Sequence, residues 1–212
     1  MKIISVQSLA LPEIKVITFG RFHDHRGYFT ETFRQSDFRD HPEIPCLEGR
    51  DFVQSNESFS KIGTVRGLHF QWDPPQGKLV RTVHGRMIDL ALDIRKDSPA
   101  FGKIVAHDMP ARPGYTTSEW IWVPPGFAHG NLFLEETVIE YFCTAQYNPD
   151  GEAGITPYAP DIDWSLCKPA LRETFREIAA TSTLVTEKDR NGFTVAEWQK
   201  DSRSSRFVYP AP

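Results

Sequence analysis

Cysteine is scarce in this chain of 212 residues. The three cysteines, Cys46, Cys143 and Cys167, are an odd number and show no CxxC spacing. This usage argues against a disulfide framework and against a cysteine zinc site. We therefore expect a protein of a reducing compartment, the cytoplasm.

Long apolar runs and an excess of basic residues are also missing. The N-terminal stretch MKIISVQSLALPEIKVITF is interrupted by Pro12, Glu13 and Lys15, so it predicts neither a signal peptide nor a membrane span. The net charge is −4, and Lys and Arg are dispersed apart from one central stretch. Neither a membrane nor a nucleic acid is an expected partner.

The chain does have the composition of a β protein. Its 15 Phe, 6 Tyr and 5 Trp favour strands, and 16 Pro with 14 Gly fit many short strands joined by turns. Strand-length runs recur about every ten residues, which is typical of a β sandwich or barrel. We expect one all-β domain over residues 1–165. Residues 166–212 are expected to form a helical extension packed on it, with helices in 171–180 and 194–202.

The stretch richest in chemical groups is TVRGLHFQWDPPQGKLVR, residues 64–81. It predicts a strand, a turn and the start of a second strand, and strict alternation would place Arg66 and His69 on opposite faces. A bulge at Gly67 would turn both side chains the same way, with Lys78 returning from the turn beside them. Such a cluster indicates a site for an anionic substrate, whereas the alternative is an ordinary core histidine at 69.

Two further stretches carry candidate groups. Arg26 lies in an expected turn over 24–27, and the aromatic pair Tyr28 and Phe29 begins a strand expected over 28–33. These residues form either a solvated hairpin tip or a clamp for a phosphate and a base. In the alternating strand 85–94, Asp89 requires a buried partner or solvent, and a histidine is one candidate.

Acid–base chemistry fits these residues better than metal or nucleophilic catalysis. Position 71 is Gln, where a metal-binding barrel would have the second histidine of a His-x-His pair, and no spacing requires His69, His84 and His129 to converge. We expect no metal and no cofactor. The chain has no GxSxG motif and no cysteine beside a histidine. A histidine base, tyrosine acids and cations remain, a set that suits removal and return of a proton next to a carbonyl.

Several motifs together resemble one family. RGYFTE (26–31), FVQSN (52–56), VRGLHFQ (65–71), GKLVR (77–81), DIRKDSP with FG (93–102) and WVPPGFAHG (122–130) are similar to the dTDP-4-dehydrorhamnose 3,5-epimerases, over roughly residues 15–165. The resemblance implies a double-stranded β-helix of the cupin jelly-roll type, a homodimer and no metal. It also implies epimerisation of a nucleotide-diphosphate 4-keto-6-deoxy sugar at carbon 3, carbon 5 or both, in deoxysugar biosynthesis.

The resemblance also implies roles for single residues. His69 would be the base, Tyr141 the general acid, and Lys78 the cation that stabilises the enolate. The substrate-binding residues would be Arg66 and His129 at the sugar or phosphate, with Gln54, Asn56, Arg26, Phe29 and Glu31 at the nucleotide, some of them across the dimer interface, and Tyr147.

One position departs from the family pattern. In the family an aspartate after a Tyr-x-Pro segment pairs with the base histidine, and here the matching position is Ala159. Asp161 or Asp89 would then orient His69, or the pair would be absent. Two alternatives therefore stand beside the double epimerase: a single-carbon epimerase of another nucleotide sugar, and a sugar-nucleotide-binding homologue with impaired turnover.

Overall fold

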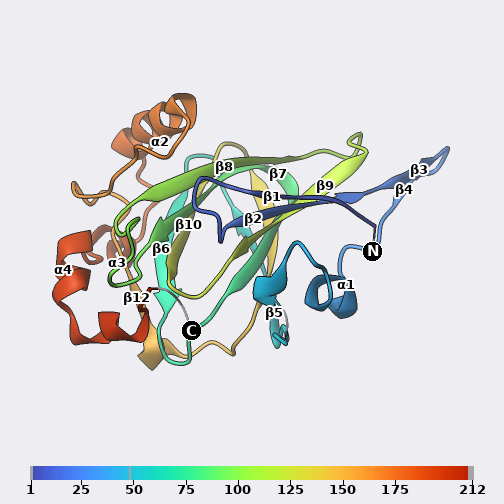
Figure 1. Ribbon diagram of the computed structural model, residues 1–212. Helices are drawn as coiled ribbons and strands as arrows, with labels where there is room; N and C mark the ends of the chain where they lie inside the picture. Colours follow the sequence, from blue (N-terminus) through green and yellow to red (C-terminus); the bar gives the residue numbers. More distant parts are fainter. Residues whose placement is uncertain (1, 48, 210–212) are drawn as a thin grey trace.

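The computed structural model describes residues 2–47 and 49–209, and strands dominate it (Figure 1). In this part of the chain the strands are β1 Ile3–Ser8, β2 Lys15–Gly20, β3 Phe22–Asp24, β4 Gly27–Phe29, β5 Gln54–Ser60, β6 Val65–Gln71, β7 Lys78–Asp93, β8 Ile104–Ala111, β9 Thr117–Val123, β10 Phe127–Phe133, β11 Thr137–Cys143 and β12 Glu152–Gly154. The helices are short: α1 Gln35–Arg39, α2 Pro169–Thr181, α3 Glu187–Arg190 and α4 Val195–Lys200, with 3-10 turns at Pro45–Leu47, Pro149–Gly151 and Ser202–Arg206.

Strand β7 joins the two halves of the main sheet. Its first residues, from Lys78, pair with β9 and β11, and its later residues pair with β8 and β10. One half therefore runs β1-β2-β9-β7-β11-β5, and the other contains β8, β7, β10, β6 and β12. All these pairings are antiparallel, as in a jelly roll, so the expected fold class is confirmed.

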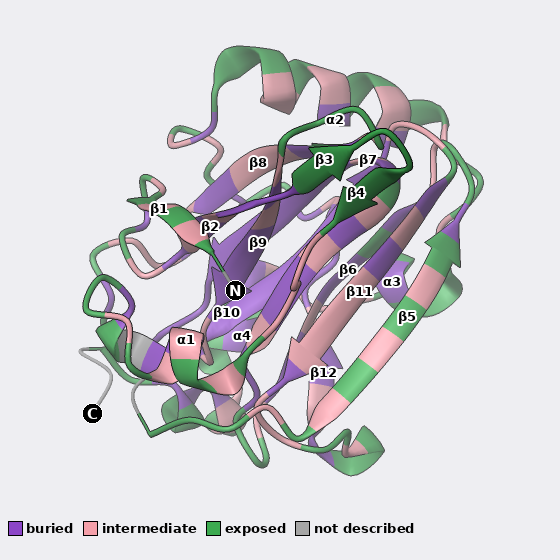
Figure 2. Cartoon of the chain, turned by 90° about the vertical axis from the view of Figure 1, so that its right-hand side faces the viewer, coloured by how far each residue is buried: buried purple, intermediate pink, exposed green. Residues whose placement is uncertain are grey.

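The alternation along 85–94 explains how β7 serves two cores. Met87 and Ala91 point between the two halves, where they pack with residues such as Val16, Val80 and Phe133. The other face of the strand carries Ile88, Leu90, Leu92 and Ile94, which pack under the C-terminal segment with Phe175, Val195 and Trp198. Figure 2 shows this buried interior beside the striped, half-exposed edge strand β5. The C-terminal residues thus contribute to a core of the barrel, although the boundary at 165 stays a prediction.

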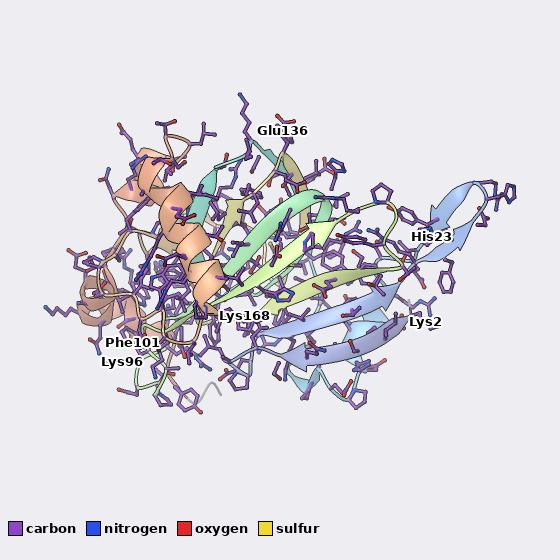
Figure 3. The ribbon with its side chains drawn as sticks, turned by 90° about the horizontal axis from the view of Figure 1, so that it is seen from above. Lys2, His23, Lys96, Phe101, Glu136 and Lys168 are labelled. Carbon is purple, nitrogen blue, oxygen red and sulfur yellow. The ribbon has the colours of Figure 1, made fainter. Side chains whose placement is uncertain are left out.

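The N-terminal segment ends in a hairpin that leaves the body of the molecule. Strands β3 and β4 form a separate two-stranded sheet with His25 and Arg26 at its turn, and the strand expected over 28–33 ends at Phe29. Figure 3 places His23 on this hairpin, which projects away from the barrel. The ring of Phe29 is largely uncovered, at 71% exposure. Within the described residues, no helix has the length and apolar character needed to span a membrane.

The bulge expected at Gly67 is present. Between β10 and β6 the register runs from His129 opposite His69 to Asn131 opposite Arg66, so β6 has one more residue than its partner. Gly67 has a φ of +107°, and a Cβ there would lie 2.7 Å from both the Gly130 Cα and the His129 carbonyl oxygen. Only glycine combines this backbone angle with so close an approach of two strands.

Replacement of Gly67 by alanine should therefore destabilise the fold. We expect Gly67→Ala to lower the free energy of unfolding by roughly 2–4 kcal/mol, since it adds both a steric clash and backbone strain. Urea unfolding followed by tryptophan fluorescence measures this change. Gly114→Ala is the matched control, because a Cβ at Gly114 meets no atom within 4 Å. Equal stability of the two variants would contradict the role of Gly67.

Candidate active site

Two adjoining pockets share three lining residues. The larger, of about 290 Å³, and the smaller, of about 150 Å³, are both lined by His69, Lys78 and Tyr141. The larger pocket also has Gln54, Asn56, Phe70, Gln71, Gln76, Cys143, Tyr147 and Glu152 in its wall. The smaller pocket adds Ser58, Arg66, His129, Gly130, Asn131 and Ile139. The bulge at Gly67 thus turns Arg66 and His69 into one cavity, as expected.

His69 is held by a carboxylate from the C-terminal segment. Its Nε2 lies 2.6 Å from an Asp189 oxygen, and the Gly67 N–H donates to the other oxygen at 3.3 Å. Burial alone would raise the pKa of Asp189, but the hydrogen bonds from His69, Gly67 and Thr186 outweigh it and hold this pKa below its usual value. The carboxylate accepts the Nε2 proton, which leaves Nδ1 of His69 with its lone pair.

The expected alternatives for this partner were wrong. Asp161 accepts hydrogen bonds from the backbone N–H groups of Val195 and Ala196, at the start of α4, and does not face His69. Asp89 pairs with His129 instead. Ala159 is buried in the apolar cluster under the C-terminal segment, where a carboxylate would lack a partner. The histidine–aspartate pair is therefore present, but a residue 120 positions away in the chain completes it.

Sequence reasoning missed Asp189 because its neighbours resemble a solvated surface segment. The run TEKDR at 186–190 is charged, and in α3 only Asp189 is buried, with 5% exposure. The one local signal is Thr186 three residues before Asp189, a helix-start pattern that the structure confirms, since the Thr186 hydroxyl accepts from the Asp189 N–H. That pattern predicts a helix end, not a pairing with a barrel strand.

Lys78 supplies a cation to both pockets. No hydrogen bond or ion pair engages its ammonium group within the described residues, so the charge is available to a ligand. Burial lowers the pKa of Lys78, and the Coulombic influence of Cys143, Glu152 and Asp89 offsets this only in part. A poorly solvated ammonium of this kind stabilises an anion more strongly than one in water does.

Tyr141 lies on the same face of β11 as Cys143, and both side chains reach the larger pocket. Burial raises the pKa of the Tyr141 hydroxyl, and a negative charge on Cys143 would raise it further. The phenol therefore keeps its proton at neutral pH. Burial likewise raises the pKa of the Cys143 thiol, despite the Lys78 charge beside it.

A second histidine–aspartate pair lies opposite the first. His129 faces His69 across the β6–β10 ladder, and its Nε2 is 2.7 Å from an Asp89 oxygen. The Asn131 side-chain amide donates to the same oxygen at 2.9 Å. The histidine expected as a partner of Asp89 is therefore His129, which is fixed in orientation at the wall of the smaller pocket, near Arg66.

The mouth of the larger pocket carries side chains with several hydrogen bonds. Gln54 donates to Asn56 at 3.0 Å and accepts from the Tyr147 N–H at 2.8 Å. The Tyr147 hydroxyl donates to Glu152 at 3.0 Å, and Lys188 donates to the same Glu152 oxygen at 2.6 Å. Gln54, Asn56 and Tyr147, all expected near a ligand, thus lie at this mouth.

Arg26, Phe29 and Glu31 do not join the cavity of their own chain. Arg26 is at the tip of the β3–β4 hairpin, paired with Asp24 at 2.6 Å and with 78% of its side chain exposed. Glu31 forms an ion pair with Arg34. Within the described residues, none of the three lines either pocket.

Gln71 occupies the position where a metal-binding barrel would have its second histidine, and its side-chain amide forms hydrogen bonds with backbone groups. It donates to the carbonyl groups of Pro74 and Gln146, both at 3.0 Å, and accepts from the Asn148 N–H at 2.8 Å. Among the described residues, no group of three or more His, Cys, Asp or Glu side chains is arranged to hold a metal ion.

A jelly roll whose cavity combines an oriented histidine, a half-buried lysine and a protonated tyrosine has the groups of an acid–base enzyme for anionic substrates. Comparison with known proteins agrees. The family model described as dTDP-4-dehydrorhamnose 3,5-epimerase matches residues 8–197. The chain therefore belongs to the dTDP-4-dehydrorhamnose 3,5-epimerase family, whose members are isomerases, as expected.

Individual relatives support this assignment. A dTDP-4-dehydrorhamnose 3,5-epimerase of Sinorhizobium fredii is 45% identical over 152 residues, 70% of this chain and 73% of that protein. One from Methanothermobacter thermautotrophicus is 40% identical over 173 residues, 80% of this chain and 83% of that protein. The crystal structure of the dTDP-6-deoxy-D-glucose-3,5-epimerase of Legionella pneumophila, in complex with dTDP-4-keto-L-rhamnose, superposes with a TM-score of 0.78 at 30% identity, covering 98% of this chain and 99% of that one.

The Asp189 pair predicts a specific dependence of stability on pH. Because the folded-state pKa of Asp189 is lowered, the paired carboxylate stabilises the fold above its ordinary value of 3.8, and this contribution is lost as the pH falls through the lowered value. We expect Asp189→Asn to reduce the free energy of unfolding by roughly 1–3 kcal/mol at pH 7 and by much less in acid. Urea titrations of both proteins at neutral and acidic pH measure the difference. A deficit that stays constant with pH would contradict this role.

Proposed function

We propose that the protein epimerises a nucleotide-diphosphate 4-keto-6-deoxy sugar of the dTDP-4-dehydro-6-deoxyglucose type, at carbon 3, carbon 5 or both. The observation that carries the proposal is the shared wall of the two pockets, where His69 with its Asp189 partner, Lys78 and Tyr141 line one cavity. Membership of the epimerase family supplies the substrate class. The dyad also weakens the alternative of a homologue with impaired turnover, since its main support was the missing aspartate.

The proposed reaction uses each group once. Nδ1 of His69 takes the proton from the carbon next to the ketone, and the electron pair of that C–H bond moves into the carbonyl to give an enolate. The Lys78 ammonium stabilises the enolate oxygen. The Tyr141 hydroxyl then donates its proton to the opposite face of the same carbon, which inverts it. Proton exchange with solvent returns the imidazolium and the phenolate to their starting states.

The remaining pocket residues suit the rest of such a substrate. Arg66 and His129 border the smaller pocket, where we place the sugar and its phosphates. Gln54, Asn56 and Tyr147 border the larger one, on the side assigned to the nucleotide. We further propose a homodimer in which the hairpin of one subunit brings Arg26, Phe29 and Glu31 to the nucleotide bound by the other.

Solvent deuterium exchange tests the proton relay. In deuterium oxide with dTDP-4-keto-6-deoxyglucose, His69→Ala should abolish label at every carbon, because the first proton then has no acceptor. Tyr141→Phe should still allow exchange from the His69 side but reduce inversion by about 10²–10⁴-fold, the usual cost of losing a positioned acid. Lys78→Ala should slow both, since the enolate is common to them. Mass spectrometry and NMR of the products measure label and configuration.

The wild-type label pattern separates the candidate functions. Label at two carbons indicates the double epimerase, label at one carbon the single epimerase, and no label a binding homologue. Exchange by His69→Ala near the wild-type rate would overturn the base assignment. Lys61→Ala, which changes a lysine in an exposed turn, is the control for the Lys78 variant.

Activity should survive removal of metal ions. The motivation is Gln71, whose amide is already engaged by three backbone groups. We expect dialysis against EDTA to leave the exchange rate unchanged. Metal analysis of the purified protein showing about one equivalent of zinc, iron or manganese, with activity lost on its removal, would contradict the expectation.

Mixed dimers test whether the hairpin serves the partner's cavity. Arg26→Ala and His69→Ala should each be nearly inactive alone, because one lacks the nucleotide contact and the other lacks the base. A mixed dimer has one intact site, with His69 from one chain and Arg26 from the other. Because about half of the dimers are mixed after subunit exchange at equal concentrations, the activity of the mixture should return to about one quarter of the wild-type value. Light scattering checks the dimer. Absence of recovery in confirmed mixed dimers would count against the shared site.

A further inference from the structure

Arg66 links the two halves of the sheet beside the smaller pocket. Residues 61–64 carry the chain from β5, which pairs with β11, to β6, which pairs with β10 and β12. The Arg66 side chain reaches back across this turn: its Nε donates to the Ser60 hydroxyl at 2.9 Å, and its Nη2 donates to the Phe59 carbonyl at 3.3 Å. Both acceptors belong to the end of β5, so one strand holds a side chain of the other.

Ser60 is a fixed acceptor that lies behind the pocket. It is the last residue of β5, it is only 2% exposed, and it lies opposite Thr137 in the β5–β11 ladder. Ser60 lines neither of the two pockets formed by the described residues, whereas Arg66 is exposed and lines the smaller one. Any influence of the Ser60 hydroxyl on a ligand therefore passes through Arg66.

The two hydrogen bonds occupy one edge of the guanidinium group. Nε and Nη2 donate on the same side of this planar group, and Nη1 has no hydrogen-bond partner among the described residues. A guanidinium group recognises phosphate best with two parallel N–H groups. With its first edge held by β5, Arg66 still has the pair formed by Nη1 and the second N–H of Nη2 for such a ligand.

The acceptors that hold Arg66 carry no charge. Arg81 and Arg86 are each paired with a carboxylate, but a hydroxyl and a carbonyl leave the positive charge of Arg66 uncompensated. This charge acts within the cavity: burial raises the pKa of Tyr141, and Arg66 opposes that rise. Ser60 therefore restricts the motion of Arg66 without cancelling the charge that an anionic ligand needs.

We propose that Ser60 is a positioning residue for substrate binding: its hydroxyl holds Arg66 in the orientation in which the guanidinium group meets the phosphates of the nucleotide sugar. This inference rests on the proposed function, because that function supplies the diphosphate. An exposed arginine without this contact samples many rotamers, and ordering it on binding costs affinity. Loss of the hydroxyl should therefore weaken binding and change the proton transfers little.

Ser60→Ala tests the inference, with Ser55→Ala as the matched control, because Ser55 lies on the exposed face of the same strand. We expect Ser60→Ala to raise the Kd for dTDP, and the KM for the nucleotide sugar, by about 3–10-fold, the usual cost of ordering one long side chain. We expect kcat for deuterium incorporation to change by less than about twofold. Ser55→Ala should match the wild type. Isothermal titration calorimetry measures Kd, and circular dichroism checks the fold.

A double-mutant cycle separates positioning from a merely structural role. When Arg66 is already replaced by alanine, Ser60→Ala should change the Kd for dTDP by less than about twofold, because the side chain that it positions is gone. An equal loss in both backgrounds, or a fall in kcat at unchanged KM, would overturn the inference.

A further measurement does not depend on turnover. The Arg66 Nε–H, hydrogen-bonded to Ser60, should give a protected resonance in ¹H–¹⁵N NMR spectra that exchanges faster in Ser60→Ala. Unchanged protection in Ser60→Ala would also contradict the inference. A wild-type protein that incorporates no deuterium would overturn the proposed function instead, and the Kd for dTDP with the Nε–H resonance would still decide whether Ser60 positions Arg66 for a diphosphate.

Discussion

The constraint on which the rest of the structure depends is the double use of β7. A strand of 16 residues belongs to both halves of the sheet, so it fixes their relative position. Between the two halves lies Gly85, whose φ is +94° and where a Cβ would clash with Glu136 and Thr137. Lys78 begins this strand, and Asp89 lies in its second half. The same strand therefore positions Lys78 and Asp89, the partner of His129. The position of that strand in turn depends on the closure of the barrel.

The cavity also depends on a part of the chain that follows the barrel strands. The barrel strands bring His69, Lys78 and Tyr141 together, but the carboxylate that pairs with His69 comes from α3. The C-terminal segment has two tasks: Phe175, Val195 and Trp198 cover an apolar face of β7, and Asp189 completes the histidine pair. The chain thus follows the path of a barrel with an extension packed on it, but the extension also contributes a residue to the candidate site.

Much of this arrangement could be predicted from the sequence, and the reasons are local. Alternation along 85–94 gave the two faces of β7, and the glycine between Arg66 and His69 predicted the bulge that turns them to one side. Asp189 could not be predicted, because a charged run such as TEKDR has no property that distinguishes a buried carboxylate from a solvated one. Arg26, Phe29 and Glu31 raise a different problem, since a projecting hairpin has no fixed neighbour within one chain.

The thiol of Cys143 limits how charge is distributed in the cavity. It lies beside Lys78, and a thiolate there would cancel the ammonium charge before a substrate arrived. Burial keeps the thiol protonated, so the lysine meets no internal counter-ion from that side. From that side the ammonium group of Lys78 therefore keeps an uncompensated positive charge. In the reaction that we propose, the enolate would neutralise this charge only while it exists, because the ketone groups of the substrate and of the product are both uncharged.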